Sequence, residues 1–244
     1  MTMAIQAQNP AAESPPSTSG ELIVEARGLT KSYGKGLAAT HVLRGTNLAI
    51  RRGEFLAVMG PSGCGKSTLL HVVGLMDRAD DGTLVIDGQD VTTASQAQRT
   101  RVRRDRMGFV FQRFNLLSTV SAADNLAISL RLHGRPADRA FIAQCLERVS
   151  VSHVAGRKSG QMSIGEQQRV AVARALAHKP ELLLADEPTG SLDTHNADAL
   201  LALFSQANAE GQTIVMITHS PAAAAVAHRT CRMSDGQIEC GQPV

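Results

Sequence analysis

Residues 60–67 constrain the fold of this chain more than any other part of the sequence. They read Gly-Pro-Ser-Gly-Cys-Gly-Lys-Ser, which fits the phosphate-loop pattern GxxxxGK[ST]. The apolar run Phe55–Met59 precedes the loop and predicts a buried strand, and Leu69, Leu70 and Val73 follow it at helical spacing. A glycine-rich turn between a strand and a helix directs backbone N–H groups at phosphate oxygens, and the helix N-terminus adds partial positive charge.

The loop therefore predicts a site for a nucleoside triphosphate. Lys66 can reach the β- and γ-phosphates, and the Ser67 hydroxyl can ligate Mg²⁺. A chance glycine turn is the alternative, and it is disfavoured because the pattern and its strand–helix context agree. The loop residues expected to bind ATP are Gly60, Pro61, Ser62, Gly63, Cys64, Gly65, Lys66, Ser67 and Thr68.

Strand and helix patterns alternate along most of the chain, which indicates an α/β fold. Residues 182–185 and 214–217 are continuously apolar, as the central strands of a parallel sheet are, and residues 197–207 between them read as a helix. Residues 115–160 read mostly as helices, broken at Gly134-Arg135-Pro136 and at Gly156, and predict a smaller helical lobe.

Composition narrows the possible partners. The net charge is +3, from 25 basic and 22 acidic residues, and this mild excess gives no reason to expect a nucleic-acid partner. No apolar run approaches the roughly 20 residues that span a bilayer, so no membrane-spanning segment is expected. Residues 1–20 are rich in Ala, Ser, Pro and Gln and predict a disordered tail before one domain at 21–244.

The four cysteines are Cys64, Cys145, Cys231 and Cys240, and they show neither CxxC spacing nor histidines at zinc-like intervals. We interpret all four as free thiols in a reducing compartment.

A pair of carboxylates supplies the second element of the site. Asp186 and Glu187 directly follow the apolar residues 182–185. A carboxylate at the end of a buried strand can hold the water shell of a metal, and the next one can polarise an attacking water. Acidic residues often end strands, so this pair alone is a weak indication of a metal site. Together with the phosphate loop it becomes a strong one.

Several motifs, in their order along the chain, resemble those of ABC-transporter ATPases. The resemblance covers about residues 21–239. The residues that carry the resemblance are Tyr33, the loop at 60–67, Gln112, Ser163-Ile164-Gly165-Glu166-Gln167, Asp186-Glu187, Ser191-Leu192-Asp193 and His219. Within the family the chain looks most like the lipoprotein-releasing and macrolide-export type. The stretches that indicate this are 108–112, Asn115-Leu116-Leu117 and 184–190.

The resemblance implies a P-loop core with a parallel sheet, an N-terminal antiparallel β subdomain and a helical subdomain. It also implies a role for each matching residue. Glu187 would act on the attacking water, His219 would touch the γ-phosphate, and Asp186, Ser67 and Gln112 would serve Mg²⁺. Gln112 would also report to the membrane partner, and Asp193 would couple the two sites of a dimer.

Tyr33 has an argument of its own. It is the one tyrosine in a chain without tryptophan, and it lies in the polar, Gly-flanked segment Lys31-Ser32-Tyr33-Gly34. Aromatic rings in such places stack well on purine faces, so an adenine platform is favoured over loop packing.

The signature motif departs from the family pattern LSGGQ, because it reads Met-Ser-Ile-Gly-Glu from Met162 to Glu166. Ser163 and Gly165 are kept, and both would face the γ-phosphate of a partner subunit. Ser163 and Glu166 also form a capping-box pattern for the helix that follows. Ile164 and Glu166 are expected to weaken ATP-driven dimerisation and to lower the basal rate.

Five arginines fall within residues 99–106. They could meet anionic lipid headgroups, but a solvated helix face is the preferred interpretation.

We expect an ATPase subunit that acts as a head-to-tail homodimer, with ATP and Mg²⁺ at the interface. It would associate peripherally with permease subunits at the cytoplasmic face of the inner membrane. An ABC ATPase of nucleic-acid or translation systems and an ATP-dependent switch without transport are the alternatives. The first usually carries two cassettes or long insertions, which this chain lacks.

Overall fold

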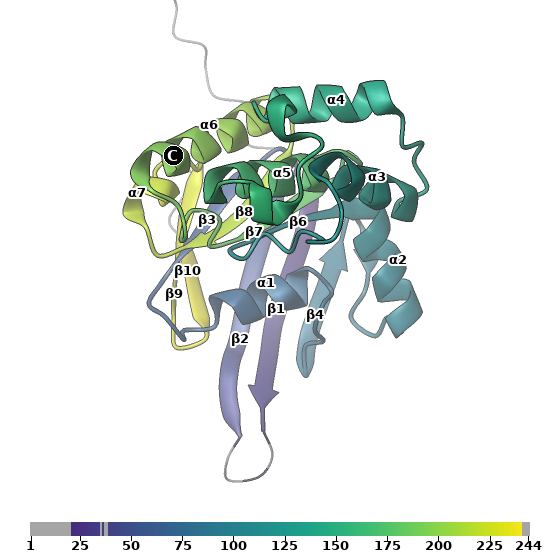
Figure 1. Cartoon of the computed structure of the whole chain (residues 1–244). Helices are drawn as coiled ribbons and strands as arrows, with labels where there is room; N and C mark the ends of the chain where they lie inside the picture. The colour runs from purple at the N-terminus through teal and green to yellow at the C-terminus, as the bar shows by residue number, and fades with distance from the viewer. Residues whose placement is uncertain (1–20, 35, 37–38, 241–244) are drawn as a thin grey trace, which may run out of the picture.

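A six-stranded sheet lies at the centre of the computed structural model, which describes residues 21–34, 36 and 39–240 (Figure 1). Its strand order is β10-β9-β3-β8-β7-β6, and all neighbours except β10 and β9 run parallel. The central strands are largely apolar because both faces of the sheet are covered. The strands are β3 (Phe55–Met59), β6 (Met107–Phe111), β7 (Leu182–Asp186), β8 (Thr213–Thr218), β9 (Arg229–Ser234) and β10 (Gln237–Cys240).

A separate antiparallel sheet is built from the N-terminal part of the chain, in the order β2-β1-β4-β5. Asp87 and Gly88 join β4 to β5 with φ angles of 49° and 71°, which is the geometry of a tight hairpin turn. The strands are β1 (Leu22–Tyr33), β2 (Thr40–Arg51), β4 (Asp81–Ile86) and β5 (Gln89–Asp90). The expected combination of a parallel core, an antiparallel N-terminal sheet and helices is confirmed.

The helices begin at side-chain caps in most cases. Ser95, Ser121 and Ser163 form capping boxes, and Asp138 and Asp193 accept hydrogen bonds from the first turns of their helices. The helices are α1 (Lys66–Val73), α2 (Gln96–Arg106), α3 (Ala122–Leu132), α4 (Arg139–Arg148), α5 (Ile164–Leu176), α6 (Thr194–Ala209) and α7 (Pro221–Ala224), with short 3₁₀ turns η2 (Ser152–Val154) and η3 (Ser159–Gln161).

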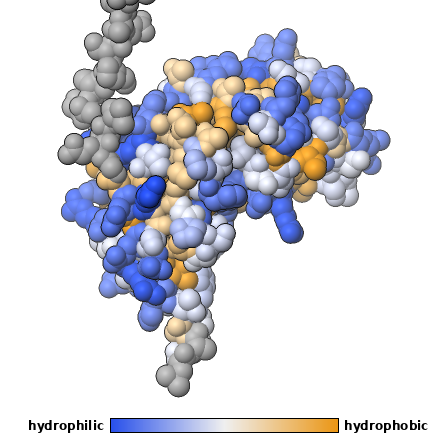
Figure 2. Space-filling view, turned by 90° about the vertical axis from the view of Figure 1, so that its left-hand side faces the viewer, coloured by the Kyte–Doolittle hydropathy of each residue, from blue (hydrophilic) through white to orange (hydrophobic). Residues whose placement is uncertain are grey.

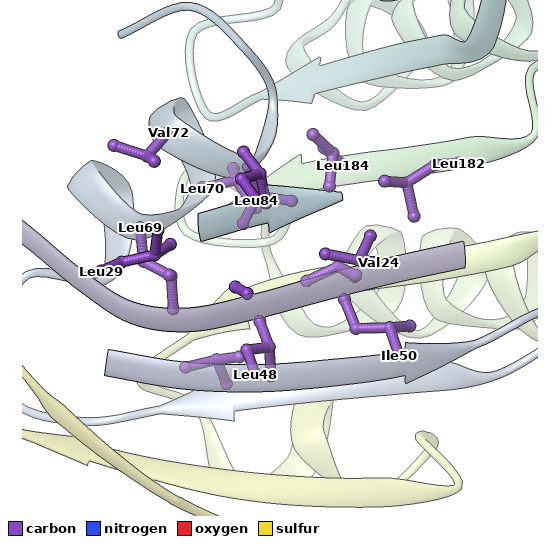
Figure 3. Packing of buried hydrophobic residues seen from close by; sticks show 14 of the residues in the cluster. Val24, Leu29, Leu48, Ile50, Leu69, Leu70, Val72, Leu84, Leu182 and Leu184 are labelled. Atoms are coloured by element: carbon purple, nitrogen blue, oxygen red, sulfur yellow. The ribbon is translucent and has the colours of Figure 1, made fainter. Parts of the chain in front are cut away.

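Helix α1 contacts strands of both sheets, and one hydrophobic cluster joins the three elements (Figure 3). Val24 and Ile50 come from the antiparallel sheet, Leu69 and Leu70 from α1, and Leu184 from the parallel sheet. A second cluster includes residues of α3, α4, α5 and α6 and covers the other face of the parallel sheet. Burial on both sides of the sheet leaves little freedom for the loops at its ends, including residues 60–67.

The arginines of α2 are only partly a solvated face. Arg99 is buried and donates to the carbonyls of Leu75 and Met76, and Arg103 donates to Leu75 as well. Arg106 pairs with Asp87, outside this helix. The interpretation of residues 99–106 as a solvated helix face is therefore wrong for these three arginines. They instead bind the loop after α1 and the β4–β5 turn.

The face of the molecule drawn in Figure 2 is mostly hydrophilic. Figure 2 shows one face that narrows toward the β1–β2 end, with apolar residues in scattered patches on its broader part. No helix within the described ranges is both long and apolar enough to cross a bilayer. The segment 1–20, expected to be a disordered tail, lies outside the described residues.

The cysteine interpretation was wrong for one pair. Cys231 and Cys240 form a disulfide, while Cys64 and Cys145 are free. The two bonded residues stand opposite each other in the β9–β10 register. Because they belong to a hairpin with a short turn, their proximity is a result of strand pairing, which spacing rules for metal sites do not detect.

Removing this disulfide should lower the free energy of unfolding. The bond closes a loop with a sequence separation of 9 residues, and chain-entropy arguments give about 2–3 kcal/mol for a loop of that size. We expect the double variant Cys231→Ser, Cys240→Ser to unfold at a lower urea concentration than the oxidised chain. Addition of a reductant to the unmodified chain should produce the same shift. Cys145→Ser is the matched control, and an equal shift in that variant would contradict the account.

Candidate functional site

The phosphate-loop residues lie between β3 and α1, as the sequence predicts. Gly65 caps α1 with a φ angle of 107°, a conformation that favours glycine. A Cβ atom at this position would also lie 2.9 Å from the carbonyl oxygen of Val42. Glycine is thus required here both by the turn and by the strand that passes beside it.

Lys66 is held inside the loop. Its Nζ donates to the carbonyl oxygens of Gly60 at 2.8 Å and Pro61 at 2.9 Å, and the residue is 7% exposed. No carboxylate of the described residues lies within ion-pair distance of this ammonium. A nearly buried cation with only carbonyl partners attracts an anion, which fits a phosphate-binding role.

Asp186 ends β7 and approaches the loop from the neighbouring side. The Ser67 hydroxyl donates to Asp186 Oδ1 at 3.3 Å. Burial raises the pKa of Asp186, although His71 and the Ser67 hydrogen bond act against this rise. A carboxylate that is desolvated in this way is stabilised by a cation placed beside it.

The oxygen donors at this position suit Mg²⁺. No group of three or more His, Cys, Asp and Glu in the described part of the chain could enclose a metal. Mg²⁺ commonly binds through one or two carboxylates together with substrate phosphates and waters, so Ser67 and Asp186 fit this ion.

Gln112 directly follows β6, next to Asp186, because Phe111 and Asp186 are partners in the parallel register. Its amide packs against the loop after Glu187: a Cβ atom on Gly190 would lie 3.0 Å from Gln112 Nε2. Gln112 therefore follows the strand that pairs with the Asp186 end of β7, and no hydrogen bond joins its side chain to Ser67 or Asp186 among the described residues.

Glu187 has a backbone φ angle of 45°, in the left-handed region that non-glycine residues seldom adopt. Its N–H donates to Ile217 at 3.0 Å, which ties the residue to the end of β8. Its Oε2 lies 2.9 Å from His219 Nδ1. The two residues that the sequence assigns to the γ-phosphate region are thus in direct contact.

One open depression brings several predicted residues together. Its lining consists of Tyr33, Val42, Ser62, Gly63, Gly65, Lys66, Ser67, Thr68 and Glu187. Of the other loop residues, Cys64 is buried beneath the turn, and its carbonyl accepts a hydrogen bond from the Gly236 N–H. We call this hollow the nucleotide depression.

The signature residues Ser163 to Gln167 are absent from this lining. Ser163 caps α5, and Glu166 Oε2 accepts from the Ser163 N–H at 2.7 Å. The other oxygen of Glu166 lies 2.7 Å from His153 Nε2. The backbone N–H of Ser163 and then His153 lower the pKa of Glu166, so its charge is already stabilised within the chain.

Gly165 packs closely against the Asn196 side chain, which would have to move to make room for a larger residue. A Cβ atom there would lie 2.2 Å from Asn196 Oδ1. Asn196 also donates to Asp193, whose other oxygen caps α6 through the Asn196 N–H. Asp193 is thereby connected to the signature helix, although its own side chain is exposed. Sequence reasoning missed Asn196 and His153, because neither belongs to a motif.

Comparisons with known proteins show which family the chain belongs to. Residues 43–190 match the family model described as ABC transporter. The chain is 44% identical to the lipoprotein-releasing system ATP-binding protein LolD of Roseobacter denitrificans, over 88% of this chain and 97% of the relative. It is 42% identical to the macrolide export ATP-binding/permease protein MacB 1/2 of Paracoccus denitrificans, over 90% of this chain. The chain spans about a third of the length of the MacB relatives that it matches.

A solved structure agrees with these relatives. The ATP-binding cassette MJ0796, described as a dimer in a post-hydrolysis state bound to ADP and Pi, superposes with a TM-score of 0.83 at 37% identity. The alignment covers 88% of this chain and 96% of that one. The chain therefore belongs to the ABC transporter family, as an ATP-binding cassette ATPase of the type that its LolD and MacB relatives contain.

Proposed function

We propose that this cassette powers a membrane transporter by closing as a dimer on ATP and opening after hydrolysis. The observation that carries the proposal is the nucleotide depression, where the buried cation of Lys66 and the carboxylate of Glu187 face the same hollow. A triphosphate bound there would meet the loop amides and Lys66 at one end and Tyr33 at the other. Mg²⁺ would be held by Ser67 and Asp186, with Gln112 nearby, and would neutralise phosphate charge.

Hydrolysis would use Glu187 as the proton acceptor. A water attacks the γ-phosphorus, the bond to the β-phosphate oxygen breaks, and the proton of the water passes to the Glu187 carboxylate. The hydrogen bond between Glu187 Oε2 and His219 Nδ1 fixes the carboxylate, and the other carboxylate oxygen is available for the water. ADP and phosphate are the products.

A second copy of the chain would complete the site. The lining of the depression includes no signature residue, which supports an arrangement in which Ser163 and Gly165 of another subunit would meet the γ-phosphate. The MJ0796 cassette, to which this chain is similar, is described as dimeric. In the head-to-tail arrangement Asp193 would couple the two sites, because it contacts Asn196 against the signature helix.

The mechanical partner would be an integral membrane permease, as the printed name of the MacB relatives, ATP-binding/permease protein, suggests. The cassette would bind it peripherally at the cytoplasmic face of the inner membrane and act in export or lipoprotein release. We also propose that residues 21–244 form one domain, with a helical lobe at about residues 115–160.

Replacement of Glu187 by Gln should separate binding from hydrolysis. Gln keeps the size of the side chain but cannot accept the proton, so kcat should fall about 100-fold or more. The Kd for ATP should stay near its original value. A variant that hydrolyses ATP at the normal rate would remove Glu187 from its assigned role.

Replacement of Lys66 by Ala should act mainly on binding. Hydrogen bonds to charged groups contribute about 1.5–3 kcal/mol, so the Kd for ATP should rise roughly 10- to 100-fold. Calorimetric titration measures this directly, and Lys179→Ala, an exposed lysine after α5, is the matched control. Equal affinities in Lys66→Ala and the control would contradict a phosphate contact.

The altered signature should limit the basal rate through Ile164 rather than Glu166. Ile164 is 52% exposed at the first turn of α5, where it would crowd a partner subunit's nucleotide. The Glu166 carboxylate is held by Ser163 and His153. Ile164→Gly should therefore raise turnover several-fold in the absence of permease, while Glu166→Gln should change it by less than about twofold. The opposite ranking would indicate that charge repulsion is the dominant cost.

A further inference from the structure

The ring of Tyr33 needs support from outside its own strand. Tyr33 is the last residue of β1 and is 42% exposed, so packing alone does not fix its ring. A platform for stacking is effective only when its orientation is set before the base arrives, because ordering a side chain on binding reduces affinity.

Asp77 supplies this support. The Tyr33 hydroxyl donates to Asp77 Oδ2 at 2.7 Å, and Lys31 Nζ donates to Asp77 Oδ1 at 3.0 Å. Lys31 Nζ in turn lies over the Tyr33 ring, 5.3 Å from its centroid, so its cation contacts one face of the ring. One carboxylate thus fixes both the ring and the cation beside it.

The electrostatics favour these contacts. Partial burial and then the bond to Asp77 raise the pKa of Tyr33, so the hydroxyl remains a donor at neutral pH. For Asp77, burial acts upward, but the hydrogen bonds from Tyr33, the Arg78 N–H and Lys31 together lower its pKa. The carboxylate therefore stays ionised as an acceptor for both partners.

Asp77 is rigidly joined to the phosphate loop. Its N–H donates to the carbonyl of His71 in the last turn of α1, the helix that begins at Lys66. The preceding residue, Met76, and Leu75 accept hydrogen bonds from buried Arg99 of α2. Tyr33 is thereby held at one end of a unit whose other end binds phosphate.

We infer that Asp77 is a positioning residue for adenine recognition, which sets the Tyr33 ring at a fixed place relative to the phosphate loop. The inference rests on the proposed role of Tyr33 as the adenine platform. It predicts that Asp77 affects the binding of nucleotides that carry a base and has no effect on the binding of a bare polyphosphate.

The test compares ATP with inorganic tripolyphosphate, which lacks the base and ribose, by calorimetric titration of the full chain. Tyr33→Ala should weaken ATP binding and leave tripolyphosphate binding unchanged. Asp77→Ala should weaken ATP binding roughly 3- to 10-fold, a part of the full stacking loss, again without an effect on tripolyphosphate. KM for ATP should rise while kcat stays the same.

Two further variants keep the test decisive if Asp77→Ala folds poorly. Asp77→Asn retains an oxygen that can accept from Tyr33 and should bind ATP within about twofold of the original chain. Tyr33→Phe lacks the hydroxyl donor. Asp77→Ala should therefore reduce ATP affinity less in a Tyr33→Phe background than in the original chain. Asp90→Asn, an exposed carboxylate of the same sheet, is the control.

The possible failures are distinguishable. If Tyr33→Ala leaves ATP affinity unchanged, the adenine role of Tyr33 is wrong and the inference falls with it. If Tyr33→Ala weakens ATP binding but Asp77→Ala and Tyr33→Phe do not, only the role of Asp77 is overturned. If Asp77→Ala weakens tripolyphosphate and ATP binding equally, Asp77 maintains the phosphate loop and does not position adenine.

Discussion

Packing of α1 against both sheets is the constraint on which the nucleotide site depends. Leu69 and Leu70 bury one helix in a cluster shared by the antiparallel and parallel sheets. The helix cannot shift without loss of this packing, so its N-terminus stays where β3 ends and its C-terminus stays near Tyr33. Elements far apart in the sequence would therefore act on one nucleotide.

This rigidity allows the site to hold buried charged side chains and a strained backbone conformation, each of which would be unfavourable in a flexible loop. Lys66 is buried with carbonyl partners alone, and Asp186 has a pKa raised by burial. Glu187 adopts a positive φ angle and depends on Ile217 and His219 for its orientation. A magnesium nucleotide would bring an anion to Lys66 and a cation to Asp186, so binding would relieve both costs.

Motifs with a fixed spacing could be predicted from the sequence, because the chemistry of each depends on neighbours in the chain. The phosphate loop, the carboxylates after residues 182–185 and the Ser163 capping box are of this kind. The parallel sheet could be predicted as well, since the apolar runs at 182–185 and 214–217 are local signals. The antiparallel sheet was expected only from the resemblance to the family.

Contacts between distant segments could not be predicted. Asp77 meets Tyr33 and His153 meets Glu166 only because the fold aligns their elements. Cys231 and Cys240 are closer in the sequence, but they meet only because β9 and β10 pair in this register. The arginines of α2 show the same limit, since a basic run looks solvated until Leu75 is found beside it. Side chains that serve tertiary contacts leave no periodic signal in the sequence.

The central claim, that each ATP site is completed by a second copy of the chain, can be tested by mixing two inactive variants. Lys66→Ala removes the phosphate contact, and Ser163→Asp keeps a helix cap but places a carboxylate toward the partner's phosphate. Mixed dimers would contain one intact site, so an equimolar mixture should recover about a quarter of the original ATPase rate. A rate no higher than the mean of the two variants alone would contradict the shared site.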